Sequence, residues 1–488
     1  MTRGNVVLLN VESGSISEGG RSRLVQRRLA IVVVIALLPL AACGARWNDA
    51  QRAQVRRRVQ TVAQSGGAAT DSGSASGDVT GSDTGAGTAT DSGSGSTGSG
   101  AASGGGTNGI SPASKKLPCA APSTAPGVTD TEIRVGSISS LTGPSPGIGT
   151  SAAGAARAYV AYRNATGGIC GRKIVLKEAD DGTDNGRYRS IITEMSNSVF
   201  GVAGGFGLGD VGGVDVIRQT RIPVVNNPGQ QASADLPTVF DMNPKYENEN
   251  AVIGKYKFLH DHGATKASVT YLAVDQSRFE AQLQMRLMKA AGIQIVQVQE
   301  LPLSTLSYDA PARGVANSGA DYLFFIGTVD ANQSMARSMQ DTGYKGLKWP
   351  EYFVYTYGTN FIQGAGSASE GAITWLRSLP IEEANKNKEL AAFVQWMNRA
   401  SPSADQDAFA EDSWSAAKAF FDNLEALKGP ITREAFVAQM NSVDTFDAGG
   451  MYGPIRIGKE LTNGCFVGMQ VKNAKWQRLV PEDGYICQ

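Results

Sequence analysis

Two short motifs carry residue types that could catalyse a reaction. Glu178, Asp180 and Asp181 place carboxyl groups close together, as acid–base cleavage of a glycosidic bond requires; a turn at a strand end is the alternative. His260 and His262 precede Gly263, a pattern typical of a helix C-terminus and too sparse for a metal site. They are the only histidines, and no G-x-S-x-G motif lies outside a Gly/Ser-rich stretch, so we expect neither a hydrolase nor a metal site.

A second group of polar residues is better suited to binding than to catalysis. Ser139, Ser140 and Thr142 follow an apolar run and precede a Gly-Pro turn, so they either face a ligand or cap the next helix. Asn226 and Asn227 follow another apolar run, and their amides can both donate and accept hydrogen bonds. These residues suit a small, neutral polar molecule.

Length and charge limit the function further. A chain of 488 residues is longer than one hydrophobic core usually organises, so we expect at least two lobes. Lys and Arg (45) balance Asp and Glu (45), which argues against binding to a nucleic-acid backbone. Nothing in the sequence calls for a cofactor.

The N-terminal part predicts export and attachment to a membrane. Arginines precede the apolar run 29–40, which is shorter than a membrane span and ends in Leu-Ala-Ala-Cys43. Residues 1–42 are therefore predicted to be a lipoprotein signal peptide, with Cys43 acylated. A plain secretory signal and a twin-arginine signal are the alternatives.

Two segments separate this signal from the folded part. Residues 43–64 hold five arginines and are predicted to be a basic, membrane-proximal tether. Residues 65–108 contain only Gly, Ser, Thr, Ala and Asp apart from Val79 and Asn108, which predicts a disordered linker. We therefore expect an extracytoplasmic protein anchored by lipid to the outer face of the cytoplasmic membrane.

From Pro118 onward, strand-like runs alternate with helical lengths, which predicts an α/β fold of mostly parallel sheets flanked by helices. The expected strands are 133–138, 173–179, 199–204, 223–226, 266–272, 294–300, 322–326, 352–355, 454–457, 465–472 and 476–480. The expected helices are 152–164, 186–197, 211–220, 247–262, 277–291, 309–318, 332–342, 386–399, 409–427 and 432–439. Ligands of such folds lie beyond the carboxyl ends of the strands.

Five segments follow one another in order along the folded part. They are GVTDTEIRVGSISSLTGP (127–144), GAARAYVAYRNATGGICGRKIVLKEADDGTD (154–184), IPVVNNP (222–228), GADYLFFIGT (319–328) and VDTFDAGGMYGPIRI (443–457). Together they resemble type I substrate-binding proteins of ABC importers, above all the branched-chain amino-acid and amide binders. The resemblance implies two lobes joined by three crossings, near Asn243, Leu376 and Gly449. Lobe one would hold 127–243 plus 377–448, and lobe two 244–376 plus 449–488.

The resemblance also implies where a ligand would be held. On lobe one it implicates the loop of Ser139 and Ser140, the loop of Phe206, and Asn226 with Asn227. No serine stands in the Phe206 loop, where amino-acid binders offer one, and Asp210 there would oppose an anion. The second wall would consist of Asp275, Phe279, Thr328, Asp330, Tyr355 and Tyr357. Asp330 would pair a ligand cation, with Glu411 behind it, and the two tyrosines would sandwich the ligand with Phe206. The resemblance also implies that residues 178–181 form a structural turn at the end of a strand.

Four further cysteines allow three pairings in an exported chain. We expect Cys119 to pair with Cys170 and Cys465 with Cys487, since each pair flanks one end of the fold. The predicted function is a solute-binding lipoprotein that passes a small polar molecule to an ABC permease. A ligand sensor that signals to a membrane receptor is the alternative, and a secreted enzyme is a third.

Overall fold

The computed structural model describes residues 119, 121–144, 147–242, 253–353, 356–458 and 464–487. The chain divides into the units Met1–Gly104 and Gly105–Gln488, and every described residue lies in the second. The predicted signal peptide, acylated Cys43, tether and linker, as well as Tyr355, therefore lie outside the described residues. No helix in the described part of the chain is both long and apolar enough to span a membrane.

The first sheet is entirely parallel and has the strand order β2-β1-β3-β4-β5. Its interior strands carry apolar side chains on both faces, as Val224 and Val225 do, because helices cover both sides. The strands are β1 (Glu132–Ser139), β2 (Lys173–Asp180), β3 (Val202–Ala203), β4 (Val224–Asn226) and β5 (Val239–Asp241). We call this sheet and its covering helices lobe one.

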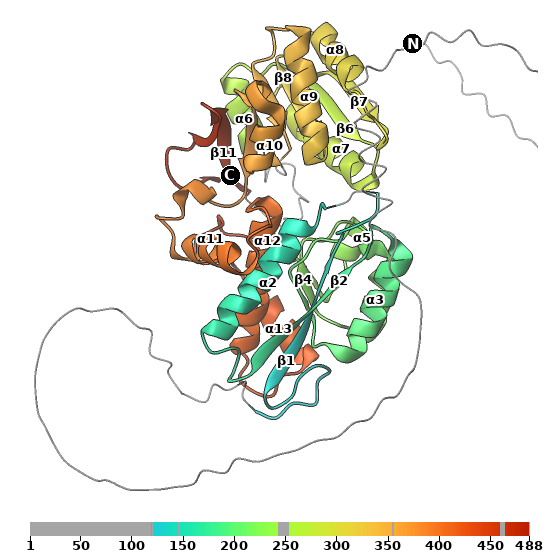
Figure 1. Cartoon of the computed structure of the whole chain (residues 1–488), viewed down its shortest axis with the longest axis vertical. Coiled ribbons are helices and arrows are strands. Elements are labelled where there is room, and N and C mark those ends of the chain that lie inside the picture. The colour runs from blue at the N-terminus through green and yellow to red at the C-terminus, as the bar shows by residue number, and fades with distance from the viewer. Residues whose placement is uncertain are drawn as a thin grey trace, which may run out of the picture. The chain divides into compact units, whose positions relative to one another are not determined.

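Helices from two distant parts of the chain cover lobe one. In Figure 1, α2, α12 and α13 lie on one side of the strands and α3 on the other. The helices are α2 (Thr150–Ala165), α3 (Asn185–Ser198), α4 (Val214–Thr220), α5 (Gln231–Ala234), α11 (Lys388–Ala400), α12 (Ala408–Glu425) and α13 (Arg433–Asn441), with the 3-10 turns η2 (Asp210–Gly213) and η6 (Ile381–Glu383). The alanine-rich face of α2 allows close packing on α12, where Tyr159 meets Trp414 edge-on with ring centroids 4.8 Å apart.

The second sheet has the order β12-β11-β10-β9-β8-β6-β7, with β13 paired to β11. Strands β6 to β10 are parallel, and the C-terminal strands β11 to β13 add in antiparallel fashion. The strands are β6 (Lys266–Leu272), β7 (Gln294–Leu301), β8 (Tyr322–Ile326), β9 (Trp349–Tyr352), β10 (Ile373–Leu376), β11 (Cys465–Lys472), β12 (Lys475–Val480) and β13 (Ile486–Cys487).

Helices α6 and α7 pack on one face of this sheet, and α8, α9 and α10 pack on the other. Their bounds are α6 (Gly254–Asp261), α7 (Asp275–Ala290), α8 (Asp309–Ser318), α9 (Val329–Thr342) and α10 (Thr359–Ala365), followed by the 3-10 turn η5 (Gly366–Ser369). We call this sheet with its helices lobe two. The predicted α/β fold of parallel sheets flanked by helices is confirmed.

Three predicted strands differ from the structure. The third is shorter at both ends: Val199 still caps α3, with its N–H bonded to the carbonyl of Met195, and the chain turns at Gly204 and Gly205, whose φ angles are +71° and +87°. The strand expected at 352–355 is β9, which ends at Tyr352. The strand expected at 454–457 is reduced to an isolated bridge between Phe446 and Ile455. Strands β5, β10 and β13 were not predicted, because each is only two to four residues long.

The segment after Gly449 packs on lobe one. Met451, Tyr452 and Ile457 lie in the same hydrophobic cluster as Tyr159 and Trp414. The N–H of Gly458 also donates to the carbonyl of Asp241 in β5. Residues 451–458, beyond the crossing expected near Gly449, thus pack on lobe one. Strand β10 ends at Leu376, where another crossing is expected.

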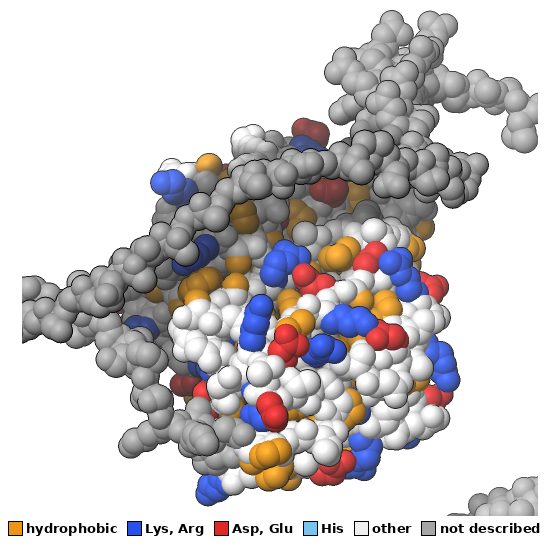
Figure 2. Space-filling model, turned by 60° about the horizontal axis from the view of Figure 1, so that its bottom comes forward, with side chains coloured by type: hydrophobic (Ala, Val, Ile, Leu, Met, Phe, Trp, Pro, Cys, Tyr) orange, Lys and Arg blue, Asp and Glu red, His pale blue; other side chains and the backbone are white. Residues whose placement is uncertain are grey.

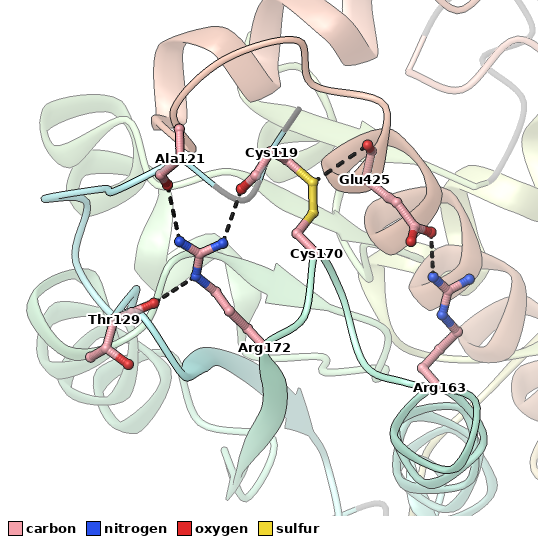
Figure 3. The surroundings of a disulfide bond; sticks show 7 residues. All are labelled: Cys119, Ala121, Thr129, Arg163, Cys170, Arg172 and Glu425. Atoms are coloured by element: carbon pink, nitrogen blue, oxygen red, sulfur yellow. Dashed lines mark hydrogen bonds and ion pairs between the residues drawn. A yellow bond between two sulfur atoms is a disulfide. The ribbon is translucent and has the colours of Figure 1, made fainter. Parts of the chain in front are cut away.

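Both expected disulfides form. Cys465 and Cys487 face each other across β11 and β13, with Cα atoms 4.1 Å apart. Cys119 joins Cys170, in the turn between α2 and β2, with Cα atoms 5.7 Å apart. The Cys119–Cys170 bond fixes the start of the described chain to lobe one (Figure 3).

Arg172 reinforces this attachment. Its Nε donates to the carbonyl of Thr129 (2.6 Å), Nη1 to that of Cys119 (3.0 Å) and Nη2 to that of Ala121 (3.0 Å). Figure 3 shows the guanidinium spread between these three carbonyls. Arg172 is 2% exposed, so its removal would take a buried donor from three carbonyl groups, one of them in the fully buried Cys119.

The surface of lobe one has mixed charge. On the face turned forward in Figure 2, Lys and Arg side chains lie among Asp and Glu side chains rather than forming a patch of one sign. That face therefore lacks the basic stripe that nucleic-acid binding requires.

We expect Arg172→Met to lower the free energy of unfolding by about 3 kcal/mol, since three hydrogen bonds from a charged donor are lost. Denaturant unfolding of the oxidised protein measures this. The matched control is Arg189→Met on α3, because the side chain of Arg189 is 54% exposed. This substitution should change the free energy of unfolding by less than about 0.5 kcal/mol. Equal effects of the two substitutions would show that Arg172 has no special structural role.

Candidate ligand-binding site

The two sheets repeat one topology. The order β2-β1-β3-β4-β5 in lobe one matches β7-β6-β8-β9-β10 in lobe two, strand for strand. In each sheet, the second strand of the chain pairs with one edge of the first strand and the third strand pairs with its other edge. Ligands of open parallel sheets bind outside the carboxyl ends of the strands at such a switch point. The candidate site therefore consists of the loops after β1, β3 and β4 on lobe one and after β6, β8 and β9 on lobe two.

The serines after β1 hold two loops together. Ser139 Oγ accepts a hydrogen bond from the N–H of Phe206 (3.2 Å). Ser140 Oγ donates to Asp181 Oδ1 (2.6 Å) and accepts from the N–H of Leu208 (2.9 Å). Both serines are almost fully buried. Their hydroxyl groups position the loop after β3 against the loop after β1.

The acidic turn after β2 has the predicted structural role. Asp181 is fully buried and, besides Ser140, accepts from the N–H groups of Thr183 (2.9 Å) and Gly209 (3.0 Å). Burial alone would raise the pKa of Asp180. Hydrogen bonds from the Thr142 hydroxyl and three backbone N–H groups outweigh burial and lower that pKa to about 2.

The loop after β3 begins with a turn that requires glycine. A Cβ atom at Gly205 would lie 2.5 Å from the carbonyl oxygen of Ile138, and the N–H of Gly205 donates to Ser413 Oγ (2.8 Å). This turn directs Phe206 onto Phe409 of α12, with ring centroids 4.4 Å apart. Ala152 completes this small apolar cluster, and all three side chains are buried.

Asp210 connects the loops after β3 and β4. Its Oδ2 accepts from the N–H groups of Gly229 (2.9 Å) and Gln230 (3.3 Å). The side chain is 1% exposed, and burial raises its pKa to about 7. One oxygen of the carboxyl that is expected to oppose an anion is thus bonded within the protein, while Oδ1 has no hydrogen-bond partner among the described residues.

The two asparagines after β4 have different surroundings. Asn227 Nδ2 donates to Asp412 Oδ2 of α12 (2.8 Å). Asn226 is 5% exposed, and its Oδ1 has no hydrogen-bond partner among the described residues. An acceptor that is buried without a partner is costly, which makes Asn226 a candidate for contact with a ligand that donates a hydrogen bond.

Asp412 is a residue that sequence reasoning missed. Besides Asn227 it accepts from Arg377 Nη2 (2.7 Å) and from the hydroxyl of Tyr452 (2.5 Å). Arg377 also donates to the carbonyl of Met242 (3.2 Å). These partners are distant in sequence, and no motif around Asp412 indicates them.

On lobe two, polar groups stand at the start of α9. Thr328 Oγ1 accepts from the N–H of Ala331 (3.3 Å) and caps the helix, and Asp330 is exposed in its first turn. Phe279 on α7 is 45% exposed. Asp275, at the start of α7, pairs with Arg278 (2.7 Å).

Tyr357 differs from its expected position. It lies five residues beyond the end of β9, is 1% exposed and packs on Trp476 with ring centroids 5.9 Å apart. Its hydroxyl donates to Glu382 Oε2 (2.5 Å) and accepts from the N–H of Ile381 (2.7 Å). Tyr357 is therefore part of the core of lobe two, while Tyr355, the other tyrosine of the expected sandwich, lies outside the described residues.

His260 and His262 lie at the C-terminal end of α6, as predicted, and no group of metal-binding side chains occurs within the described ranges.

The family model described as periplasmic binding protein matches residues 132–475, which is more than half of the chain. The chain belongs to the periplasmic binding protein family. None of the curated protein sequences matches it.

Solved structures of similar fold support this assignment. A fatty acid ABC transporter substrate-binding protein from Thermomonospora curvata has a TM-score of 0.61 at 19% identity, over 74% of this chain and 94% of that one. LivJ of Streptococcus pneumoniae, a branched-chain amino acid binder solved with isoleucine, has a TM-score of 0.60 at 16% identity (72% and 100%). A solute-binding protein of Rhodopseudomonas palustris solved with benzoate has a TM-score of 0.58 at 17% identity (73% and 97%). This periplasmic binding protein therefore shares the two-lobed type I fold.

We expect Asp180→Asn to destabilise this periplasmic binding protein by about 2 kcal/mol at pH 7. The folded pKa lies below the ordinary value, so the carboxylate stabilises the protein above about pH 4 and loses this effect as the pH falls towards 2. Unfolding curves from pH 7 to pH 2 should therefore converge at the acid end. Asp341→Asn, on the exposed surface of α9, should follow the wild type throughout. A constant difference between Asp180→Asn and wild type would contradict the prediction.

Proposed function

We propose that this periplasmic binding protein captures a small polar molecule, an amino acid or an amide-like compound, between its lobes and delivers it to an ABC permease in the membrane. The observation that carries the proposal is the repeated topology, because it gives each lobe a switch point whose loops bear polar groups. The family consists of binding proteins, and we propose no catalytic activity for this member.

The proposed contacts on lobe one combine one apolar surface with hydrogen-bonding groups. Phe206 would pack on the apolar part of the ligand, and Asn226 would accept a hydrogen bond from it. Asn227 would contribute from the same loop, held by Asp412. Ser139 and Ser140 would act mainly by fixing these loops, since their hydroxyl groups are already bonded.

The proposed contacts on lobe two come from the other switch point. Asp330 would pair an amino group of the ligand, and Thr328 would position it by capping α9. Tyr355 and Phe279 would add aromatic contacts, and Tyr357 would support the loop after β9 from within the core. Contacts to one ligand from both lobes would favour closure about the crossings.

We also propose that the protein is exported and anchored through acylated Cys43, with residues 43–108 as tether and linker. The acyl chain and the arginines of 43–64 would supply the two signals that stable membrane attachment needs. Its place would then be the outer face of the cytoplasmic membrane, beside the permease.

The ligand class can be tested by isothermal titration and thermal shift with amino acids, amides, aromatic acids and fatty acids. These compounds include the classes named for the structures from Streptococcus pneumoniae, Rhodopseudomonas palustris and Thermomonospora curvata. We expect an amino acid or amide to bind and to raise Tm, because it binds the native state selectively.

For that ligand, Asp330→Ala and Asn226→Ala should each weaken binding at least tenfold, a loss of about 1.4 kcal/mol. Asp341→Ala, on the same helix as Asp330, is the matched control and should leave Kd unchanged. Binding that survives both site substitutions would refute this site. Binding without ligand uptake in cells that carry the transporter would favour a sensor instead.

A further inference from the structure

Carboxyl groups line the junction between the two lobes. They belong to η6, to the loop before α12 and to the start of α12. Their donors follow β9 and β10 or lie on α10 and β12. Two have a guanidinium partner: Glu383 pairs with Arg478 (2.6 and 2.8 Å) and Asp412 with Arg377 (2.7 Å). The others meet neutral donors: Glu382 accepts from Tyr357, Asp405 from Asn360 and Glu411 from Ser378.

Glu411 is the most deeply buried of these groups. Its exposed fraction is 0%, and only Oε2 is bonded, to the hydroxyl of Ser378. Oε1 has no hydrogen-bond partner among the described residues. A buried carboxylate with one neutral donor lacks the compensation that an ionised group needs.

The charges around Glu411 do not supply that compensation. The ionisable groups that face it are Asp407 and Asp412 on α12, Glu382 on η6, Tyr357 after β9, Tyr452 in the segment after α13 and Tyr485 near the C-terminus. Arg377 is close by, but it is paired with Asp412, and Arg478 with Glu383. Burial therefore raises the pKa of Glu411 well above its ordinary value, and the neighbouring acids raise it further.

Ser378 links this carboxyl to the crossing segments. It follows β10 by two residues and forms a bridge with Tyr452, while the N–H of Leu379 donates to the carbonyl of Met451 (2.7 Å). Hydration of an ionised Glu411 requires water to enter between Ser378 and α12, and hence the movement of this crossing segment. The protonation state of one side chain is thus coupled to the junction between the lobes.

We infer that Glu411 is a proton-dependent latch: when neutral it holds the crossing segment 377–382 on α12, and when ionised it releases that segment. The direction of the pH dependence follows from the linkage between protonation and stability. The packed arrangement has its full stability below the ordinary glutamate range near pH 4 and loses stability as the pH rises from there towards the folded pKa. No ligand enters this coupling, so it holds whether or not the proposed cargo is correct.

Hydrogen exchange of the full chain, followed by mass spectrometry at pH 5.5 and pH 8.5, tests the latch. At pH 8.5, amides of 377–382 should exchange at least tenfold more slowly in Glu411→Gln than in wild type, because glutamine cannot ionise. At pH 5.5, about one unit above the ordinary glutamate pKa, the difference between the two proteins should be several-fold smaller than at pH 8.5. Comparison at one pH removes the intrinsic pH dependence of exchange, and strands β6 and β8 serve as internal references.

The control is Glu434→Gln on α13, an exposed glutamate that should match wild type at both pH values. Equal exchange of wild type and Glu411→Gln at pH 8.5, or the same difference at both pH values, would overturn the inference. Ser378→Ala gives a second test if Glu411→Gln does not fold. Loss of the hydroxyl that bonds Glu411 should accelerate exchange of 377–382 at pH 5.5, where the neutral carboxyl holds the segment, and should change exchange little at pH 8.5, where the segment is already released. Acceleration by the same factor at both values would show a purely structural role for the bond.

Discussion

The arrangement of this protein depends on the carboxylate of Asp412 at the start of α12. It accepts hydrogen bonds from Asn227 of the candidate site, from Arg377 where the chain leaves lobe two, and from Tyr452 in the segment that packs on lobe one. Because it is buried, it needs these donors, and the donors lose their orientation without it. One charge therefore connects a binding loop to two segments of the junction.

The repeated sheet order gives this connection its significance. The switch points in the two lobes are built by the same strand sequence, but their loops differ in chemistry. Lobe one presents an aromatic pair and a buried amide, whereas lobe two presents a capped helix start with an exposed acid. A ligand between them would meet two dissimilar surfaces, because function depends on the loops that a fold carries rather than on the fold itself.

The sequence predicts the periodic elements well, because local patterns determine them. Strands β6 and β8 begin and end where their apolar runs do, and α8 lies between its predicted bounds. The errors arise where long-range contacts decide. The aromatic stretch from Trp349 allowed several strand positions, and pairing with β8 selects the one that ends at Tyr352. The apolar residues that follow Gly449 fit either lobe, and only packing assigns them to lobe one.

The same limit applies to the site. The positions of Ser140 and Asn227 at strand ends follow from the apolar runs that precede them, but their partners do not. Ser140 bonds Asp181, 41 residues away, and Asn227 bonds Asp412, 185 residues away. Residue type indicated groups able to bind a ligand; tertiary contacts decide which of them are already engaged by the protein.

The disulfide between Cys119 and Cys170, together with Arg172, has a mechanical consequence. The chain enters lobe one at Cys119, well before β1, and is held there by the turn between α2 and β2. The bond closes a loop that contains both β1 and α2. A pull on the preceding residues would therefore pass through the disulfide to the turn before β2 rather than along the backbone of β1.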